Sequence, residues 1–202
     1  MPRLYDKLEK NMMIDTGELL RDSNFDPWSQ GERLSDFDYE NNEMDAEELA
    51  RTLISRQDLY GGVGITASQL GIDARVFAFK ENTGSELVDK VAFNPNILGY
   101  SEEVTLEMEG CLSYPGLFIK VKRPKSLQVE YWTEKGDRIE TVLGEFTARV
   151  FAHEYDHCEG TDFRDRASQL HLRAGLKKRK FYLRKMKQHL KAEYNKAQRE
   201  GK

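Results

Sequence analysis

The sequence predicts an α+β fold in which mostly antiparallel strands pack around a central helix carrying HEYDH, with an N-terminal helix and a long C-terminal helix. Short runs rich in β-branched and aromatic residues fill the middle of the chain, and turn residues separate them. The connections between these runs are too short for crossover helices, which favours antiparallel pairing. With 202 residues, of which 39% are hydrophobic, the chain can form one domain with a substantial core.

The N-terminal segment, residues 1–43, is polar and acidic. The acidic run at residues 36–48 is expected to be a solvated loop that leads into a helix. Apolar residues then recur at helical spacing, so residues 44–58 are predicted to form an amphipathic helix. Asp45 is placed to cap this helix, with Glu48 in the capping-box position. The glycines of YGGVG end the helical pattern.

The middle of the chain is predicted to be rich in strands. The runs that predict them are residues 75–80, 90–94, 116–121, 126–132 and 138–143. The helical pattern returns from Glu145 to Cys158, and a second long helix is predicted over residues 169–198. Residues 44–167 therefore form the main domain, followed by a helical segment, residues 168–202.

This C-terminal segment is strongly basic. It holds 12 Lys and Arg against 2 Glu, a net charge of +10, which leaves −14 for the rest of a chain whose total is −4. Its apolar residues fall on one helical face that we expect to pack on the domain: Leu176, Leu183, Met186, Leu190 and Tyr194. Such a cationic helix attracts a polyphosphate surface in a salt-dependent way. The apolar face lacks the bulk of a strong membrane anchor, so no membrane partner is expected, although an anionic membrane surface remains the alternative. DNA is not an expected partner either.

The cysteine content and the first residues of the chain indicate a reducing compartment such as the cytoplasm. Two cysteines, Cys111 and Cys158, are too few for a disulfide-stapled secreted scaffold, although one structural disulfide remains open. Cys158 is interpreted as a small buried apolar residue. The opening residues resemble neither a signal peptide nor a transit peptide, and no apolar run is long enough to span a membrane. We expect a monomer in a bacterial or host cytoplasm, with a mature organellar form as the alternative.

The residues HEYDH are typical of a catalytic metal site on a helix. His153 and His157 lie on one helical face and can bind the same cation, while Glu154 can reach a metal-bound water. A surface helix with two unrelated histidines would give the same five residues. The interpretation therefore needs a third ligand from elsewhere in the sequence.

Two further segments supply residues for such a site. In EGCLSYPG, a glycine precedes Cys111 and a Pro-Gly turn follows it, so the backbone can aim a thiolate into a cleft. In GGVGITASQL, Gly62 and Gly64 allow another chain to approach closely, and Gln69 offers an amide donor for an oxyanion. A helix stop followed by a turn is the alternative interpretation of this second segment.

Taken in order, the three segments resemble the motifs of the peptide deformylases. They are GVGITASQ at residues 62–69, EGCLS at 109–113 and AHEYDH at 152–157. The resemblance extends to NPNIL at residues 94–98 and covers roughly residues 44–166. Thr66 replaces the first alanine of the family pattern, and Ala152 stands where a glutamine usually precedes the histidine.

The resemblance implies that residues 44–167 are a catalytic metallohydrolase domain that deformylates formylmethionyl peptides. It implies these ligands of one divalent metal: Cys111, His153 and His157. Glu154 would act as general base and then general acid when a metal-bound hydroxide attacks the formyl carbon, while Gln69 and the N–H of Leu112 would stabilise the oxyanion. Iron(II) is implied in the cell, although physics alone ranks zinc higher. Zinc, nickel or cobalt is expected in purified protein.

Other residues are assigned to substrate binding and to orientation of the ligands. Gly62, Gly64 and Gly110 would let the peptide lie as an added strand. Val63, Phe146 and Val150 are either the walls of a methionine pocket or part of the core. The family pattern suggests that Glu109 and Arg123 form a pair that orients the ligands, although an exposed ion pair would look identical in sequence. Asp156 is either a further residue of this kind or a structural acid.

The basic helix is expected to contact ribosomal RNA, because bacterial-type deformylases dock on the ribosome through a C-terminal helix. The candidate contacts are Lys177, Lys178, Arg179, Lys180, Arg184, Lys185 and Lys187. Two other functions remain open from the sequence. HEYDH alone permits a zinc endopeptidase, and the basic helix alone permits a non-enzymatic ribosome-associated RNA-binding factor with a structural metal.

Overall fold

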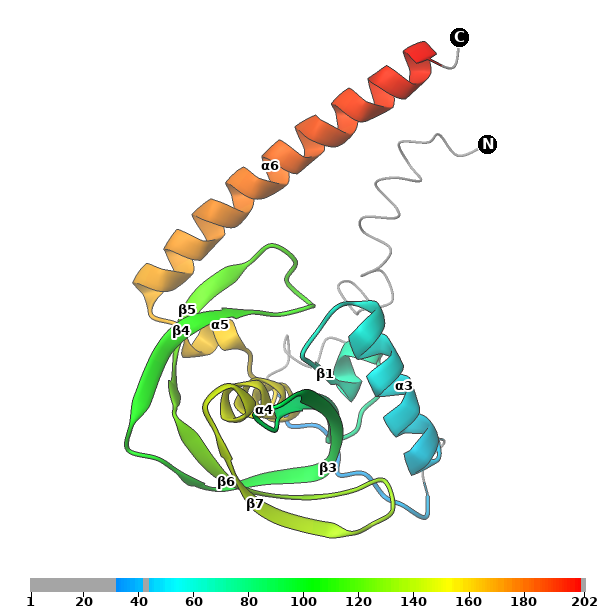
Figure 1. The fold of residues 1–202 in the computed structure, drawn as a ribbon, viewed down its shortest axis with the longest axis vertical. Helices are drawn as coiled ribbons and strands as arrows, with labels where there is room; N and C mark the ends of the chain where they lie inside the picture. The colour runs from blue at the N-terminus through cyan, green and yellow to red at the C-terminus, as the bar shows by residue number, and fades with distance from the viewer. Residues whose placement is uncertain (1–31, 42–43, 201–202) are drawn as a thin grey trace.

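The computed structural model describes residues 32–41 and 44–200 and has the predicted α+β fold, with antiparallel strands wrapped around one helix (Figure 1). A five-stranded sheet has the order β1-β2-β3-β6-β7, and β4 and β5 form a separate two-stranded sheet. Every strand pair is antiparallel, as the short connections predicted. The strands are β1 (Gly64–Thr66), β2 (Val76–Asn82), β3 (Leu87–Tyr100), β4 (Val104–Gly110), β5 (Phe118–Pro124), β6 (Ser126–Trp132) and β7 (Arg138–Gly144).

β1 and β4 were not predicted as strands, and β3 is longer than its prediction. β4 was not predicted, although its residues alternate as those of a strand do. Its outward-facing residues are apolar and its inward-facing residues are polar, the reverse of the usual pattern. β3 is longer than the predicted residues 90–94, because the chain continues as a strand beyond Pro95 with irregular register against β6. Asn94 takes a positive φ of 47° at this irregularity.

The central helix α4 (Glu145–Cys158) has the predicted bounds and is buried over almost its whole length. Strands of both sheets contact this helix and surround it on most of its sides (Figure 1). Phe151 packs edge-to-face on Phe77 and Phe79 of β2, with ring centroids 4.9 and 5.4 Å apart. Cys158 is fully buried with a free thiol, as predicted, and Cys111 is also free. This packing fixes the helix that carries HEYDH.

The helix α3 (Ala46–Leu59) covers β1 and β2 with an apolar face that includes Leu49 and Leu53. Asp45 is its N-cap residue, but its side chain makes no capping hydrogen bond, so the predicted capping box is wrong. This end of the helix is exposed, and water can bind its first N–H groups. The acidic Glu47 and Glu48 of the first turn complement the helix dipole.

The segment before α3 is not a fully solvated loop. Leu34 and Phe37 are 3% and 5% exposed, and the N–H of Leu34 donates to the carbonyl of Cys158 at 2.8 Å. Phe37 packs edge-to-face on Phe93 at 4.9 Å. An aromatic residue within an acidic run therefore ties this segment to the core. The rest of the predicted N-terminal segment, residues 1–31 and 42–43, lies outside the described residues.

The C-terminal helix α6 (Gln169–Glu200) follows a short helix α5 (Phe163–Arg166) and packs on β5 only near its beginning (Figure 1). Gly175 lies so close to β5 that an added Cβ would be 2.9 Å from the carbonyl oxygen of Phe118. Leu176 and Leu183 are 44% and 39% exposed, so the expected packing of this apolar face is wrong for both. The side chains of Met186, Leu190 and Tyr194 lie outside the described set. Among the helices of residues 32–41 and 44–200, none is long and apolar enough to cross a membrane.

Candidate active site

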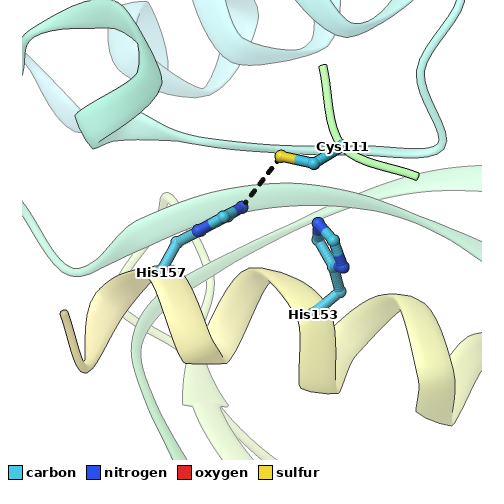
Figure 2. Close-up of side chains that lie close together, drawn as sticks. All are labelled: Cys111, His153 and His157. Atoms are coloured by element: carbon cyan, nitrogen blue, oxygen red, sulfur yellow. Dashed lines mark hydrogen bonds between the residues drawn. The ribbon is translucent and has the colours of Figure 1, made fainter. Parts of the chain in front are cut away.

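Three side chains able to hold one metal ion meet beside α4 (Figure 2). Cys111 approaches from the turn after β4, and its sulfur points toward the rings of His153 and His157 on the helix. The ligand atoms of the three residues lie within 4.8 Å of one another. The Sγ of Cys111 is 3.4 Å from the Nε2 of His157. One thiol and two imidazoles at this spacing fit a single divalent cation.

The local structure explains why these three residues meet. His153 and His157 are one helical turn apart, with ring centroids 5.0 Å apart. A turn in which the N–H of Tyr114 donates to the carbonyl of Cys111 at 2.9 Å brings the thiol to them. Gly110 has no room for a side chain, because an added Cβ would lie 2.7 Å from Cε1 of Phe118.

The electrostatics of the group favour a thiolate. Burial raises the pKa of the Cys111 thiol, but the neighbouring imidazoles outweigh burial and lower this pKa to about 6. Burial lowers the pKa of His153, whereas hydrogen bonds to Cys111 and Glu109 raise it well above its ordinary value. The lowered pKa of Cys111 and the raised pKa of His153 both favour a thiolate beside a protonated imidazole. A divalent cation held by these residues would take the place of that proton, since such a cation binds thiolate and neutral imidazole.

Glu109 orients the first histidine. Its Oε2 lies 3.2 Å from the Nδ1 of His153, which leaves the Nε2 of that ring for a metal. Arg123 binds both oxygens of the same carboxylate at 3.0 Å. Burial raises the pKa of Glu109, but hydrogen bonds from His153 and Arg123 outweigh it and lower this pKa to about 2. The carboxylate is therefore ionised and held on two sides.

Asp156 completes this network from the far side of Arg123. Its Oδ2 accepts from Nη1 of Arg123 at 2.5 Å, and its Oδ1 accepts from Nη2 of Arg166 at 2.7 Å. Both partners of the Arg123 pair are almost fully buried. The structure thus brings together the three residues that the sequence assigned to orientation of the ligands.

Arg149 is a member of this network that the sequence analysis missed. Its Nη1 donates to Oε1 of Glu109 at 2.6 Å, and its Nη2 donates to the Oγ1 of Thr105 at 2.7 Å. Glu107 lies 3.6 Å from its Nε. The signal was present in the sequence, because an arginine four residues before His153 shares that residue's helical face.

Glu154 follows His153 on α4 and is 4% exposed. The hydroxyl of Thr66 donates to its Oε2 at 2.7 Å. Gln69 stands nearby on the short 3-10 helix η1 (Ala67–Leu70), where its Oε1 accepts from the N–H of Thr66 at 2.9 Å. Its Nε2 donates to the Oγ of Ser113 at 3.0 Å and lies 3.7 Å from the sulfur of Cys111. An amide donor and a carboxylate therefore flank the ligand group.

Four of these residues line one cleft with a volume of about 540 Å³: Gln69, Cys111, His153 and Glu154. Leu112, assigned to the oxyanion, also lines it, as do the residues assigned to substrate binding: Gly62, Val63, Gly64, Gly110, Phe146 and Val150. Val63 and Phe146 are 43% and 36% exposed, so both offer apolar surface to the cleft. Val150 is 6% exposed and belongs to the core as well as to the cleft wall.

The candidate RNA contacts lie on α6, and none of those whose side chains the structure describes is among the residues that line the cleft. Arg179 is partly engaged with the domain, because its Nε donates to the carbonyl of Pro115 at 2.9 Å. The side chain of Lys187 lies outside the described set. The other five are exposed: Lys177, Lys178, Lys180, Arg184 and Lys185.

Comparison with known proteins is consistent with the class that this fold and site define, the metal-dependent hydrolases. The family model for polypeptide deformylase matches residues 30–173, and the chain belongs to this family. A peptide deformylase of Thermotoga petrophila is 38% identical over 122 residues, which are 60% of this chain and 72% of the relative. One from Borreliella burgdorferi is 35% identical over 126 residues, 62% of this chain and 75% of the relative.

Solved structures agree with the family. A plant peptide deformylase is 28% identical with a TM-score of 0.69, and the match covers 85% of this chain and 92% of the plant chain. The Met-Ala-Ser-bound deformylase from Acinetobacter baumannii is 30% identical with a TM-score of 0.64, covering 73% of this chain and 96% of the relative. The chain is therefore an enzyme of the deformylase class, a metal-dependent hydrolase. Membership favours this activity over the endopeptidase and the non-enzymatic factor.

Proposed function

We propose that this chain removes the formyl group from formylmethionyl nascent peptides, with Glu154 as general base and general acid. The observation that carries the proposal is the meeting of Cys111, His153 and His157 in one group, next to a cleft that Cys111, His153 and Glu154 line. The thiol of Cys111, from the turn after β4, joins the two imidazoles of α4. The HEYDH motif alone does not predict this third ligand. The donor set fits one divalent cation.

The three ligands would hold the metal, and Glu109 would keep His153 in the tautomer that binds it. A cation bound there supplies Lewis acidity that activates water toward a carbonyl carbon. Thiolate and imidazole bind zinc more tightly than iron(II) on general grounds. We nevertheless propose iron(II) in the cell, as the family implies, with zinc, nickel or cobalt able to replace it in purified protein. Metal analysis of anaerobically prepared protein tests this choice.

Glu154 would accept a proton from the attacking water and deliver it to the leaving nitrogen as the C–N bond of the formamide breaks. The products are formate and the free amino terminus. The amide of Gln69 and the backbone N–H of Leu112 would donate to the oxygen that becomes negative during the attack. Both residues line the same cleft as Glu154.

The peptide would lie between β1 and β4, which face each other across the cleft and each have an unpaired edge. Backbone hydrogen bonds with such edges do not depend on the side chains of the peptide. An enzyme that acts on nascent chains of many sequences requires this tolerance. Val63, Phe146 and Val150 would contact the methionine side chain. The length of the Met-Ala-Ser peptide that the Acinetobacter relative binds suits a cleft of this size.

The basic face of α6 would place the enzyme on ribosomal RNA, where nascent chains emerge. Five of its cations are exposed in the structure, and the helix leaves the domain after its first turns (Figure 1). We place the enzyme in the cytoplasm as a monomer that is active on its own.

The proposal is tested with the substrate formyl-Met-Ala-Ser and the variant Glu154→Gln. The variant should retain the metal and the fold but lose turnover by at least about 1000-fold, because the amide cannot accept the proton. Glu145→Gln is the matched control, since Glu145 is exposed at the start of α4. Substantial turnover by Glu154→Gln would contradict the proposed role.

A further inference from the structure

We propose that Thr66 is a positioning residue whose hydroxyl holds the Glu154 carboxylate in the orientation needed for proton transfer. This inference rests on the proposed role of Glu154. Thr66 ends the short edge strand β1 and is fully buried against α4. It is also one of the two positions where the chain departs from the family pattern.

The hydroxyl of Thr66 has two acceptors within reach. Its Oγ1 lies 2.7 Å from Oε2 of Glu154 and 3.3 Å from the backbone carbonyl oxygen of the same residue. A hydroxyl carries one proton, and a charged carboxylate at the shorter distance is the stronger acceptor. Thr66 therefore donates to the carboxylate.

Gly64 and Thr66 act on the two oxygens of this carboxylate from one face of β1. Residues i and i+2 of a strand point to the same side. A Cβ on Gly64 would lie 2.4 Å from Oε1 of Glu154, so the glycine leaves space for that oxygen. Thr66 binds the other oxygen. The terminal torsion of a glutamate is broad when nothing restrains it, and this pair of contacts selects one orientation.

Alanine, the residue of the family pattern, has no donor to offer at this position. The N–H of Thr66 also holds the Oε1 of Gln69, but that contact involves the backbone and survives any side-chain substitution except proline. The Thr66 side chain also takes part in a capping box with Gln69, so Thr66→Val changes that contact together with the one to Glu154, whereas Thr66→Ser keeps the oxygen for both.

The test compares Thr66→Val, which keeps the shape without the donor, with Thr66→Ser, which keeps the donor. Thr66→Val should lower kcat for formyl-Met-Ala-Ser about 10- to 100-fold, the usual effect of losing a hydrogen bond to a charged group. KM and the metal content should stay within about 2-fold of the wild-type values, since neither substrate nor ligands touch the hydroxyl. Thr66→Ser should restore kcat to within about 3-fold of the wild type, as the retained donor predicts.

Thr147→Val is the matched control for placing valine at a buried threonine. The Oγ1 of Thr147 accepts from the N–H of Asn82 at 2.9 Å, and this residue lies on α4 as Glu154 does. Its kcat should equal that of the wild type. If Thr66→Val does not fold, Thr66→Ala serves in its place and should show the same loss of kcat.

Two results would overturn the inference. One is a wild-type kcat in Thr66→Val, and the other is an equal loss of kcat in Thr66→Ser, which would assign the effect to volume. Either result together with an inactive Glu154→Gln leaves the proposed function standing. Turnover by Glu154→Gln would instead overturn the proposed function itself.

Discussion

Glu109 accepts from the Nδ1 of His153 at 3.2 Å and is itself held by the buried guanidinium groups of Arg123 and Arg149. One carboxylate thereby connects a candidate metal ligand to charges on β5 and α4. We therefore expect the orientation of the His153 imidazole to depend on that carboxylate as well as on the helix.

Replacing Glu109 by glutamine should weaken metal binding about 10- to 100-fold, because the neutral amide binds the imidazole N–H less strongly. Competition with a chelator measures the Kd directly and does not depend on turnover. Glu107→Gln is the control, since this carboxylate is exposed and lies 3.6 Å from Arg149. Equal metal affinity in Glu109→Gln and the wild type would show that the helix alone orients His153.

Replacing Arg149 by methionine should destabilise the fold by about 3 kcal/mol or more, since it leaves the buried Glu109 with one fewer cationic donor. Chemical denaturation measures the change in the free energy of unfolding. Arg138→Met removes a largely exposed guanidinium from the surface of β7 and should cost at most about 1 kcal/mol. A loss of similar size in both variants would contradict the importance assigned to Arg149.

Adding a methyl group at position 64 should strongly lower kcat and leave the metal content unchanged. In Gly64→Ala the new Cβ would meet Oε1 of Glu154 at 2.4 Å and push the carboxylate out of place. We expect a fall in kcat of about 100-fold or more, because misplacement of a catalytic group by about 1 Å has this effect. Gly144→Ala is the control, since nothing lies within 4 Å of its added Cβ. Unchanged kcat in Gly64→Ala would show that Glu154 can move without loss.

The stability contributed by Asp162 should depend on pH. Burial raises the pKa of this N-cap residue of α5, but hydrogen bonds from the side chain and the N–H of Arg164 outweigh burial and lower it. A carboxylate with a depressed pKa stabilises the fold fully above its unfolded pKa of about 3.9 and loses this contribution as pH falls through the folded value.

Asp162→Ala should therefore cost about 1 kcal/mol at pH 7, as the loss of a helix cap does. The difference from the wild type should shrink as the pH falls below about 3.9, the ordinary pKa of aspartate. Denaturation of the metal-depleted proteins across this range provides the measurement. A difference that stays constant with pH would assign the stabilisation to packing and not to charge.

Reversing the charge of the exposed cations of α6 should abolish co-sedimentation with ribosomes at low salt and leave hydrolysis of a short formyl peptide unchanged. The substitutions are Lys177→Glu, Lys178→Glu, Lys180→Glu, Arg184→Glu and Lys185→Glu. Arg179 is retained, because it binds the carbonyl of Pro115 and helps to seat the helix. Wild-type binding should weaken steeply with added salt. Undiminished co-sedimentation of the variant would exclude this face as the contact.

Much of the fold follows from local patterns in the sequence. The bounds of α4 and β6 agree with the prediction, because a buried helix and a central strand have strong periodic signals. β4 shows where such patterns mislead. Its residues alternate, but Val104, Leu106 and Met108 face outward and are 42–49% exposed. Its inner face is polar because Thr105 and Glu109 meet Arg149 there.

The residues of the site could be predicted from the sequence only where they belong to motifs of a known family. Cys111, His153 and His157 come from distant segments, and the resemblance to a family placed them together before the structure did. Arg149 and the hydroxyl of Thr66 act through tertiary contacts for which the sequence gives only a weak local signal. The partners of Arg149 and Thr66 lie on other elements, so they are known only when the packing of the strands and the helix is known.

The most direct test of the central claim is X-ray absorption spectroscopy at the metal edge of the anaerobically purified protein. The account predicts about one metal per chain, with one sulfur at about 2.3 Å and two imidazole nitrogens at about 2.0 to 2.1 Å if the metal is zinc. A spectrum without a sulfur ligand would show that Cys111 does not bind the metal, and the proposed chemistry would lose its centre.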